Sequence, residues 1–500
     1  MLSVTDKVCA SCALVWLRRD LRLHDHRALA AACGSGARVF VAFVFDTTIL
    51  GALDNPDDRR LTFIHDSLAE VDAALRPRGA RLLVAHGDPA VEIPRLAQAL
   101  GASSVWTNKD YEPSAIARAA AVAAALKAAG VGFTALKDQV VFEAREVLTK
   151  TGGVYKVFTP YRTAWLSALG AAAGSGTEPD AARACDPDLG ALAECDAEAF
   201  RGRTLDDWPL ERLGFRRQPL WIAPGMRGAK QLLARFRPKV ADYETARNHP
   251  APAAEEPDGT SGLSAHLRFG TVSIRECARL ALATRGADTW LSELVWREFY
   301  QMILSQTPEL AEGRPYKPET AGIRWPGTDA HFAAWCEGRT GYPIVDAAMR
   351  HFNRTGWMHN RLRMIVAMFL VKDLLVDWRR GEAYFARHLL DFDFAANNGG
   401  WQWSASTGCD AQPYFRIFNP VGQSERYDPD GRYLRSELPE LAACADREIH
   451  FPHAKGSNPR AAAYPLPLVD HGHQRMKAMG LFQGGERRTI QREPGASPFR

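Results

Sequence analysis

The first part of the chain alternates short apolar runs with helical stretches, and this alternation constrains the fold more than any other feature. The apolar runs cover residues 13–17, 38–45, 81–85 and 103–107, and the helical stretches between them include 61–76 and 113–129. Runs that are apolar at nearly every position are typical of parallel strands buried on both faces. Strands that alternate with helices predict a doubly wound, parallel-sheet α/β domain over residues 1–136.

The pattern changes to helical periodicity from about residue 226, as in 228–236, 271–284 and 291–305. We therefore expect an all-α domain over residues 226–480, followed by a flexible polar tail over 481–500. Residues 137–225 lie between the domains and contain Gly170, Gly174 and Gly176 in a small-residue stretch. A phosphate loop would need a preceding strand and a following Lys-Ser/Thr, so we predict a long connector instead.

Composition excludes several classes of protein. The net charge is +4, so any nucleic-acid contact must come from a local basic patch. Such a patch is predicted around Asn360 and Arg361, from Arg350, Arg354, Arg363, Arg379 and Arg380. The nine cysteines show no disulfide framework, and the lone Cys9-x-x-Cys12 has no second pair, which predicts reduced thiols and no metal site. The longest apolar run is too short to span a bilayer, and no signal peptide is evident. We expect a monomeric cytoplasmic protein with no membrane partner.

A cluster of charges follows the first predicted strand, in LVWLRRDLRLHDHRAL. Ligands of open α/β sheets bind at the carboxyl ends of the strands, so a bound small molecule is one interpretation. No GxGxxG is present, and on physical grounds a salt-bridged turn is favoured. Its members are Arg18, Arg19, Asp20, Arg22 and Asp25.

The most unusual stretch is Thr355–Trp403, which combines three features. An amphipathic segment places Asn360 and Met364 on one helical face, two acids bracket Phe392, and an Asn-Asn-Gly-Gly turn leads into two tryptophans. An ordinary core helix with a polar rim would explain the amphipathic segment. It does not explain the two acids or the two tryptophans that follow. Rings and charges at this density indicate a site for an aromatic, charged ligand.

Two further segments have the composition of binding sites. The hydroxyl cluster Thr260-Ser261-Gly262-Leu263-Ser264 can bind phosphate, or it can simply cap a helix; both interpretations stay open. In the helical segment 290–300, a carboxylate and two rings recur at i, i+3 and i+7, which is unusual for a plain core face. An exposed helix edge is the alternative for this stripe, which consists of Glu293, Trp296 and Tyr300.

These segments resemble, in order, the motifs of the cryptochrome/photolyase family, and the resemblance covers about residues 13 to 475. TSGLS, ELVWREFY and the region around DFDFAANNGGWQW are similar to the family's flavin and substrate motifs, and WMHNRLRM looks like that of class I cyclobutane pyrimidine dimer photolyases. The resemblance implies an N-terminal antenna domain, a long connector and a C-terminal helical FAD-binding domain.

The resemblance also implies roles for individual residues. FAD would be bound by Tyr243, Thr260, Ser261, Gly262, Leu263, Ser264, Trp290, Arg297, Arg363, Asp391, Phe392, Asp393 and Asn397. Arg363 would pair with Asp391. The lesion in DNA would contact Glu293, Trp296, Tyr300, Asn360, Arg361, Met364 and Trp403. Glu293 and Asn397, which faces flavin N5, would be catalytic, together with an electron relay formed by Trp325, Trp378 and Trp401.

The implied function is light-dependent DNA repair by a carbon–carbon lyase, in which excited, reduced FAD donates an electron to a cyclobutane pyrimidine dimer in double- or single-stranded DNA. Relatives that act on the (6-4) photoproduct tend to have His at the positions of Asn360 and Met364, so this chain favours cyclobutane dimers. The alternatives are a flavin photoreceptor without repair activity, and a nucleotide-binding protein fused to a DNA-binding module without photochemistry.

The antenna chromophore stays open. Some class I enzymes hold a folate with a Cys-Lys pair where this chain has Glu309-Leu310-Ala311-Glu312, so that contact is lost. Glu112 still fits a folate or deazaflavin contact. Methenyltetrahydrofolate, a deazaflavin, a flavin or an empty pocket are all compatible with the sequence.

Overall fold

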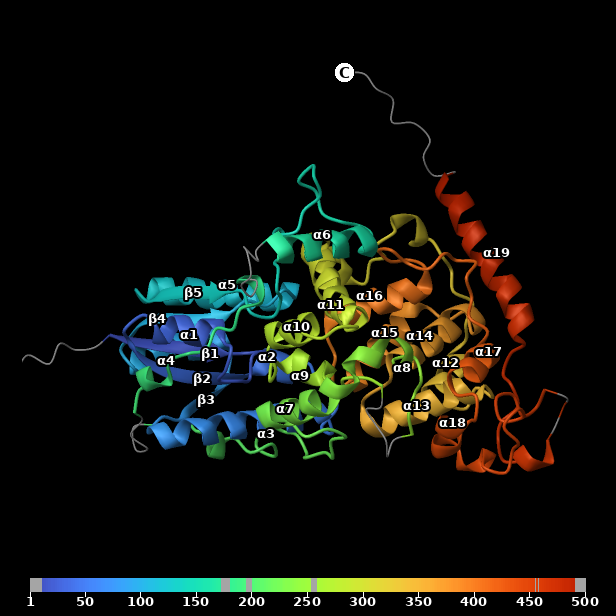
Figure 1. Cartoon of the computed structure of the whole chain (residues 1–500), viewed down its shortest axis with the longest axis horizontal. Helices are drawn as coiled ribbons and strands as arrows, with labels where there is room; N and C mark the ends of the chain where they lie inside the picture. The colour runs from blue at the N-terminus through green and yellow to red at the C-terminus, as the bar shows by residue number, and fades with distance from the viewer. Residues whose placement is uncertain are drawn as a thin grey trace, which may run out of the picture. The chain divides into compact units, whose positions relative to one another are not determined.

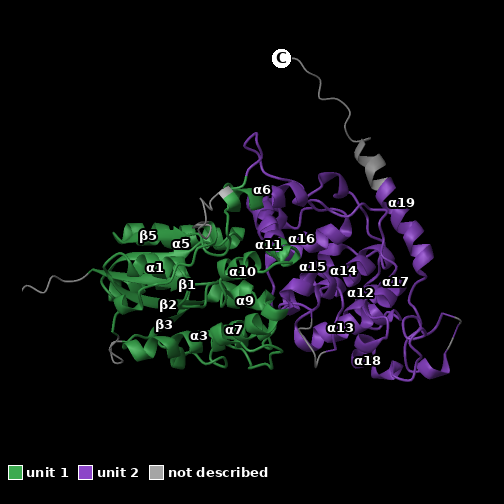
Figure 2. Ribbon diagram, in the orientation of Figure 1, with its two compact units in different colours: residues 1–147, 164–238, 263–294 green, residues 148–163, 239–262, 295–500 purple. Residues whose placement is uncertain are grey.

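A computed structural model of the chain describes residues 11–171, 180–194, 200–252, 259–454, 456 and 458–490. Cys9 of the Cys-x-x-Cys pair lies outside these residues. The chain forms two compact units, shown in different colours in Figure 2. Unit 1 contains residues 1–147, 164–238 and 263–294, and unit 2 contains 148–163, 239–262 and 295–500.

Unit 1 is built on a five-stranded sheet in which all neighbouring strands are parallel (Figure 1). The strand order is β3-β2-β1-β4-β5, which confirms the predicted doubly wound α/β fold. The fifth strand was not predicted, because its sequence GFTAL begins with glycine and its residues are only partly buried. The strands are β1 (Cys12–Leu17), β2 (Arg38–Asp46), β3 (Leu82–Gly87), β4 (Ala102–Asn108) and β5 (Gly132–Leu136).

The central strand β1 is buried on both faces, which explains its continuous apolar sequence. Leu14 and Trp16 join one apolar cluster with residues of α4 (Pro89–Ala99) and α5 (Pro113–Ala128). Ala13, Val15 and Leu17 alternate with them and are also buried, so they face the other side of the sheet. The remaining helices of the unit include α1 (Arg27–Cys33), α2 (Thr47–Leu50), α3 (Arg59–Leu75), α7 (Gly225–Phe236), α9 (Ser264–Phe269) and α10 (Ile274–Leu282).

Unit 2 is helical, as predicted for the C-terminal part of the chain. Helices α6 (Phe158–Ala171) and α11 (Asp288–Gln306) each contribute residues to it. Its core is an aromatic-rich cluster that includes Trp335, Phe385 and Trp401. The other helices are α8 (Tyr243–Ala246), α12 (Asp329–Glu337), α13 (Pro343–Thr355), α14 (Asn360–Met368), α15 (Trp378–His388), α16 (Phe394–Ala405), α17 (Pro420–Tyr427), α18 (Arg432–Glu437) and α19 (His471–Ile490).

Two local predictions differ from the structure. The Asn-Asn-Gly-Gly segment is not a turn but part of α16, because Asp393 caps that helix and accepts a hydrogen bond from the Ala396 N–H at 3.1 Å. Helix α19 continues to Ile490, into the predicted tail, since Phe482 is buried against the rings of Trp325 and Tyr414. Within the described residues, no helix is long and apolar enough to cross a membrane.

A π-helical turn, η9 (Phe369–Asp373), places two charged side chains in the interior of unit 2. The Lys372 ammonium donates to Ser406 Oγ at 3.0 Å and lies 3.5 Å from the centre of the Phe482 ring. Burial lowers the pKa of Lys372 to about 7. Asp373 is 1% exposed and pairs with His471 Nδ1 at 2.6 Å. The start and the middle of α19 are therefore both fixed to this turn.

Replacing Asp373 with asparagine is expected to flatten the pH dependence of thermal stability between about pH 4 and 6. Burial raises the pKa of Asp373 from 3.8 to about 6, although the hydrogen bond with His471 acts in the opposite direction. Because the folded state binds this proton more tightly than the unfolded chain, its stabilising contribution is full below about pH 4 and is lost as the pH rises through about 6. The shift corresponds to about 3 kcal/mol.

Thermal unfolding midpoints across this pH range measure the effect. Asp329→Asn is the matched control, because the Asp329 side chain is 94% exposed in its pair with Arg380. A variant at Asp373 that keeps the slope of the unmodified protein would contradict the assignment of this carboxyl.

Candidate functional site

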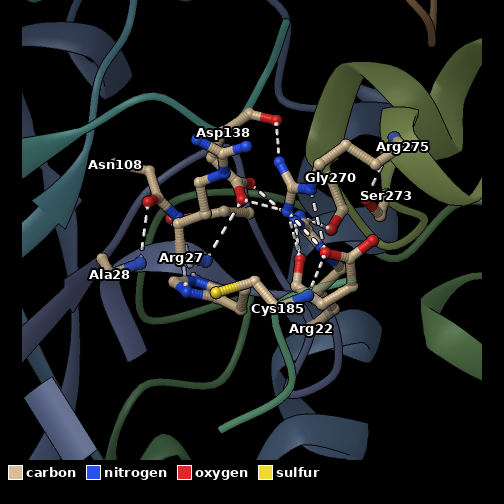
Figure 3. A network of polar contacts seen from close by, with 12 residues as sticks. Arg22, Arg27, Ala28, Asn108, Asp138, Cys185, Gly270, Ser273 and Arg275 are labelled. Atoms are coloured by element: carbon tan, nitrogen blue, oxygen red, sulfur yellow. Dashed lines mark hydrogen bonds and ion pairs between the residues drawn. The ribbon is translucent and has the colours of Figure 1, made fainter. Parts of the chain in front are cut away.

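The charges after β1 are engaged in ion pairs, as the sequence favoured, but most of their partners lie far outside the turn, and Figure 3 shows the network around Arg22. Arg22 pairs with Asp138 at 2.6 Å, and Arg275 pairs with Asp138 and Asp25 at 2.8 Å each. Burial alone would raise the pKa of Asp138, but Arg22 and Arg275 outweigh it and hold the pKa well below its usual range. The charged groups of this network pair with one another, and these ion pairs stabilise unit 1.

A second group of charges lies where the chain leaves β4. The Glu112 carboxylate, predicted as a possible antenna contact, pairs with Arg19 at 3.0 Å and with Arg268 at 2.8 Å. Arg19 also pairs with Asp110 at 3.2 Å. The charged groups at this end of the sheet therefore pair with one another. A ligand that contacts the Glu112 carboxylate competes with two guanidinium groups.

The hydroxyl segment 260–264 does not act as a side-chain cap for the helix that follows it. Gly262 has a φ of 64°, a left-handed conformation that glycine adopts without strain. The helix that follows, α9, has only six residues, and no side-chain cap is present at its start. Thr260 Oγ1 and Ser264 Oγ are each buried without a hydrogen-bond partner in the described structure.

The two acidic residues after α15, Asp391 and Asp393, make different contacts. Asp391 Oδ2 accepts a hydrogen bond from Arg363 Nη2 at 2.7 Å, and Arg363 Nε donates to the Met358 carbonyl at 2.8 Å. Asp391 Oδ1 is buried and has no partner among the described residues. Asp393 is 9% exposed and caps α16. A buried carboxylate oxygen without a donor costs free energy, so Asp391 points to a ligand that supplies one.

Asn397 is held by a residue that the sequence analysis did not identify. Its Nδ2 donates to the backbone carbonyl and to Oε1 of Glu382, both at 3.1 Å. Burial raises the pKa of Glu382, while the hydrogen bond from Asn397 acts against this shift. Since the amide nitrogen is occupied, the Asn397 oxygen is the atom left to face a ligand. The two residues are fifteen positions apart, and no helical periodicity relates them.

The start of α14 presents the residues predicted to contact DNA. Asn360 is exposed, and Arg361 Nη2 donates to Asn248 Oδ1 at 2.6 Å. The Arg361 guanidinium lies 4.5 Å from the centre of the Tyr427 ring, and Arg426 lies 5.3 Å from the same ring. Tyr427 and Asn248 therefore orient Arg361. The sequence offered no signal for either contact beyond the family-like YDPDGRYLR segment.

His359, which precedes α14, is a second residue missed in the sequence. It is 3% exposed, and its Nδ1 accepts from the Arg361 N–H at 3.1 Å, so the proton sits on Nε2. That buried Nε2–H has no partner among the described residues. Burial, followed by the charges of Arg361, Arg247 and Arg363, lowers the pKa of His359 to about 3. It is a neutral hydrogen-bond donor available to a ligand.

The wider basic patch predicted from the arginines of this region is mostly neutralised. Each pairs with a carboxylate, and most of the partners are remote in sequence and invisible to a count of local charges. The pairs are Arg350–Glu440, Arg354–Glu437, Arg363–Asp391, Arg379–Asp377 and Arg380–Asp329. Arg361, which these arginines surround, donates its side-chain hydrogen bond to an amide oxygen and not to a carboxylate.

Helix α11 covers Asp288–Gln306, slightly more than the predicted 291–305, and it contains the predicted three-residue stripe. Glu293, Trp296 and Tyr300 are all half-buried. The Trp296 and Tyr300 rings lie 5.4 Å apart. A Cβ on Gly399 of α16 would stand 2.3 Å from the Tyr300 ring, so glycine is required for this close approach.

The predicted relay residues lie in or against the core of unit 2. Trp401 and Trp378 are 2% and 1% exposed, and Trp325 is half-buried at the edge of the cluster. Trp335, not singled out in the sequence, contacts Trp401 edge-on at 6.0 Å. The other predicted residues vary in exposure: Tyr243, Leu263 and Trp290 are buried, whereas Arg297, Met364, Phe392 and Trp403 are half-buried.

Buried polar atoms without partners occur on three of the residues predicted to bind FAD, as well as on residues in other parts of the described structure. Thr260, Ser264 and Asp391 each contribute one such oxygen. FAD carries a pyrophosphate, hydroxyls and ring donors and acceptors, so these residues fit it chemically. In folded proteins buried polar groups are rarely left unpaired, which is the physical reason to expect a bound polar ligand here.

Comparisons with known proteins give two family matches. Residues 13–182 match the family described as DNA photolyase, and residues 290–484 match the FAD binding domain of DNA photolyase. A deoxyribodipyrimidine photo-lyase of Vibrio cholerae is 40% identical over 483 residues, which cover 94% of this chain and 99% of the relative.

Solved structures agree with these matches. A class III photolyase from Agrobacterium tumefaciens superposes with a TM-score of 0.84 at 33% identity, covering 97% of this chain and 100% of that one. A photolyase from Sulfolobus tokodaii, solved with two FAD molecules, gives a TM-score of 0.77 at 31% identity, covering 95% and 100% of the two chains.

Proposed function

This chain belongs to the cryptochrome/photolyase family, and on that premise we propose that it splits cyclobutane pyrimidine dimers in DNA with the energy of blue or near-ultraviolet light. The observation that carries the proposal is the set of unpartnered buried oxygens on Thr260, Ser264 and Asp391, residues that match the family's FAD motifs. The complete set of lesion-contact types along α11, α14 and α16 supports repair over signalling.

The residues divide into three tasks. Thr260, Ser264 and Asp391 hold FAD through their buried oxygens, and Asn397 presents its amide oxygen while Glu382 holds its nitrogen. The chemistry supplied by bound, reduced FAD is the light-driven transfer of one electron to the dimer, followed by its return after the cyclobutane ring opens. Trp401, Trp378 and Trp325 pass electrons that keep the cofactor reduced.

Lesion contacts come from the exposed and half-buried residues. Asn360 and the oriented Arg361 bind the DNA strand, Trp296 and Trp403 receive the extruded dimer, and Glu293 hydrogen-bonds a base. Because the dimer is poorly stacked, its extrusion costs less than that of normal bases. Part of the binding free energy comes from attraction between the DNA phosphates and Arg361 and Arg426. Binding is therefore expected to weaken as the salt concentration rises.

The α/β unit serves as an antenna domain. The Sulfolobus tokodaii photolyase was solved with two FAD molecules and described in terms of a novel light-harvesting cofactor. A second chromophore bound by this chain has to be accommodated beside the Arg19–Glu112–Arg268 cluster or elsewhere at the strand ends. An additional near-ultraviolet absorption band in the purified protein is the expected sign of it.

The test is a repair assay on an oligonucleotide that contains one thymine cyclobutane dimer, with reduced protein and matched light and dark arms. Loss of the dimer in the light arm alone, with a flavin absorption spectrum in the same sample, is the expected result. A flavin spectrum without repair would favour a photoreceptor. Protein that is colourless and cannot be reconstituted with FAD would overturn the assignment.

Replacing Glu293 with alanine is expected to lower the repair yield per absorbed photon about ten-fold, with little change in FAD content. The carboxylate stabilises the base during electron transfer, and it is not among the predicted FAD residues. Repair yield and flavin absorbance, measured on the same samples, separate the two effects. Glu309→Ala is the control, because Glu309 is an exposed carboxylate shortly after the same helix. Equal losses of yield and FAD would contradict the role of Glu293.

A further inference from the structure

The ring of Phe158 lies flat on the indole of Trp296. Their centroids are 3.7 Å apart and their planes differ by 9°, the shortest separation of any ring pair in the described structure. Phe158 is 8% exposed, whereas Trp296 is half-buried. One face of the indole is thus covered by protein while part of the residue remains accessible.

Other rings restrict the indole further. Phe299 meets Trp296 edge-on at 5.5 Å, and Tyr300 lies at 5.4 Å with a tilt of 34°. Phe158 also packs edge-on against Phe299 at 5.8 Å. Phe299 and Tyr300 belong to the same helix as Trp296, so Phe158 is the contact that comes from a remote segment of the chain.

Two hydrogen bonds fix the segment that carries Phe158. Its backbone N–H donates to Asp410 Oδ2 at 3.0 Å, and the Lys156 carbonyl accepts from Cys409 Sγ at 2.9 Å. Asp410 has a φ of 47°, which is uncommon for a residue other than glycine and indicates a position set by its surroundings. Residues 148–163 belong to unit 2, the same unit as Trp296 and the 409–410 turn (Figure 2).

We propose that Phe158 is a positioning residue for lesion binding: it holds the Trp296 indole in the orientation that receives the extruded dimer. The proposal rests on the proposed function, in which Trp296 contacts the lesion. An indole already held by a stacked ring loses less rotational freedom when a dimer packs on it, so the stack favours binding of damaged DNA. The stack is not expected to influence FAD content or the affinity for undamaged DNA.

The test is a double-mutant cycle in the FAD-loaded protein, read by equilibrium binding to oligonucleotides with and without one thymine dimer. The variants are Phe158→Ala, Phe158→Tyr, Trp296→Ala and the double variant. Phe158→Ala is expected to weaken binding of the damaged strand by about 3- to 10-fold. Affinity for undamaged DNA and FAD content stay close to those of the unmodified protein, while the loss of a buried ring lowers the thermal midpoint. Phe158→Tyr, which keeps the ring, restores affinity.

Coupling decides the proposal. In the double variant, loss of Phe158 adds nothing to the loss caused by Trp296→Ala if the two residues act as one contact. Additive losses, or damaged-strand affinity unchanged in Phe158→Ala, would overturn the proposal while leaving the proposed function intact. Unchanged affinity in Trp296→Ala would overturn the role of Trp296 itself, and the proposal with it.

Two further variants exclude a general packing defect. Phe158→Leu fills the space without an aromatic face, so it remains informative if the alanine variant does not fold, and it is expected to bind like Phe158→Ala. Tyr155 lies in the same segment, and its ring centroid is 6.0 Å from that of Tyr161. Tyr155→Ala is expected to bind the damaged strand like the unmodified protein. Equal defects in Tyr155→Ala and Phe158→Ala would favour a structural role for the segment.

Discussion

Asp391→Ala is expected to yield protein with less than about a tenth of the normal FAD content. The substitution removes the buried Oδ1, which has no protein partner, and also Oδ2, which pairs with Arg363 at 2.7 Å. Both losses are expected to weaken FAD binding. The cofactor loses a hydrogen-bond acceptor, and no carboxylate balances the charge of the Arg363 guanidinium. Removing one member of a buried pair costs more than removing both, because the remaining charge stays in a poorly solvated environment.

Flavin absorbance per polypeptide, followed by titration of the apoprotein with FAD, measures this effect. Asp329→Ala is the control, since that carboxylate also pairs with an arginine, Arg380 at 2.8 Å, but is 94% exposed. Asp391→Asn separates the two contributions, because it keeps an oxygen acceptor and removes the charge that balances Arg363. Normal FAD content in Asp391→Ala would exclude this carboxylate from the flavin site.

The second large effect is expected from Gly381→Ala, which should slow light-driven reduction of the bound flavin at least about ten-fold. A Cβ at Gly381 would stand 2.1 Å from Cη2 of Trp401 and 2.6 Å from Leu370 Cδ2. Trp401 is 2% exposed and is enclosed by Trp335 and Phe385, with ring centroids at 6.0 and 5.1 Å. It cannot move aside without disturbing the core, and overpacking of this kind costs about 1 to 3 kcal/mol.

Bleaching of the oxidised-flavin absorption band under blue light gives the rate of flavin reduction. Trp401→Phe supplies the reference rate for a relay that lacks Trp401. Gly480→Ala in α19 is the matched control, because a Cβ there meets nothing within 4 Å. Alanine at that helical position is expected to stabilise the protein by about 0.5 to 1 kcal/mol. Bleaching at the normal rate in Gly381→Ala would show that the placement of Trp401 does not limit electron transfer.

Two features of the site could be predicted before the structure was known, for different reasons. The pairing of Arg363 with Asp391 and the helical stripe on α11 were both predicted, and both are present. The stripe could be predicted because it depends on helical spacing, which is a property of one segment. The Arg363–Asp391 pair came instead from the family resemblance, because the motif preserves a contact that spacing does not report.

Other features depend on residues that the chain brings together from afar. Arg361 is oriented by Asn248, 113 positions away, and Phe158 covers Trp296 from a segment that the sequence assigned to a connector. The arginines of the predicted basic patch illustrate the same point: all five form ion pairs with carboxylates, most of them remote in sequence. A local count of charges cannot include partners that only packing supplies.

The amino-acid sequence by itself determined the classes of structure. Runs of apolar residues specified buried parallel strands, helical periodicity specified the C-terminal unit, and ordered motifs indicated a flavin-dependent repair enzyme. Tertiary structure alone decided which polar atoms remain unpaired, which arginine lacks a carboxylate partner, and which ring lies on Trp296. The physical reason is that periodicity and propensity act within a segment, whereas pairing and stacking depend on which distant side chains packing places within a few ångströms of one another.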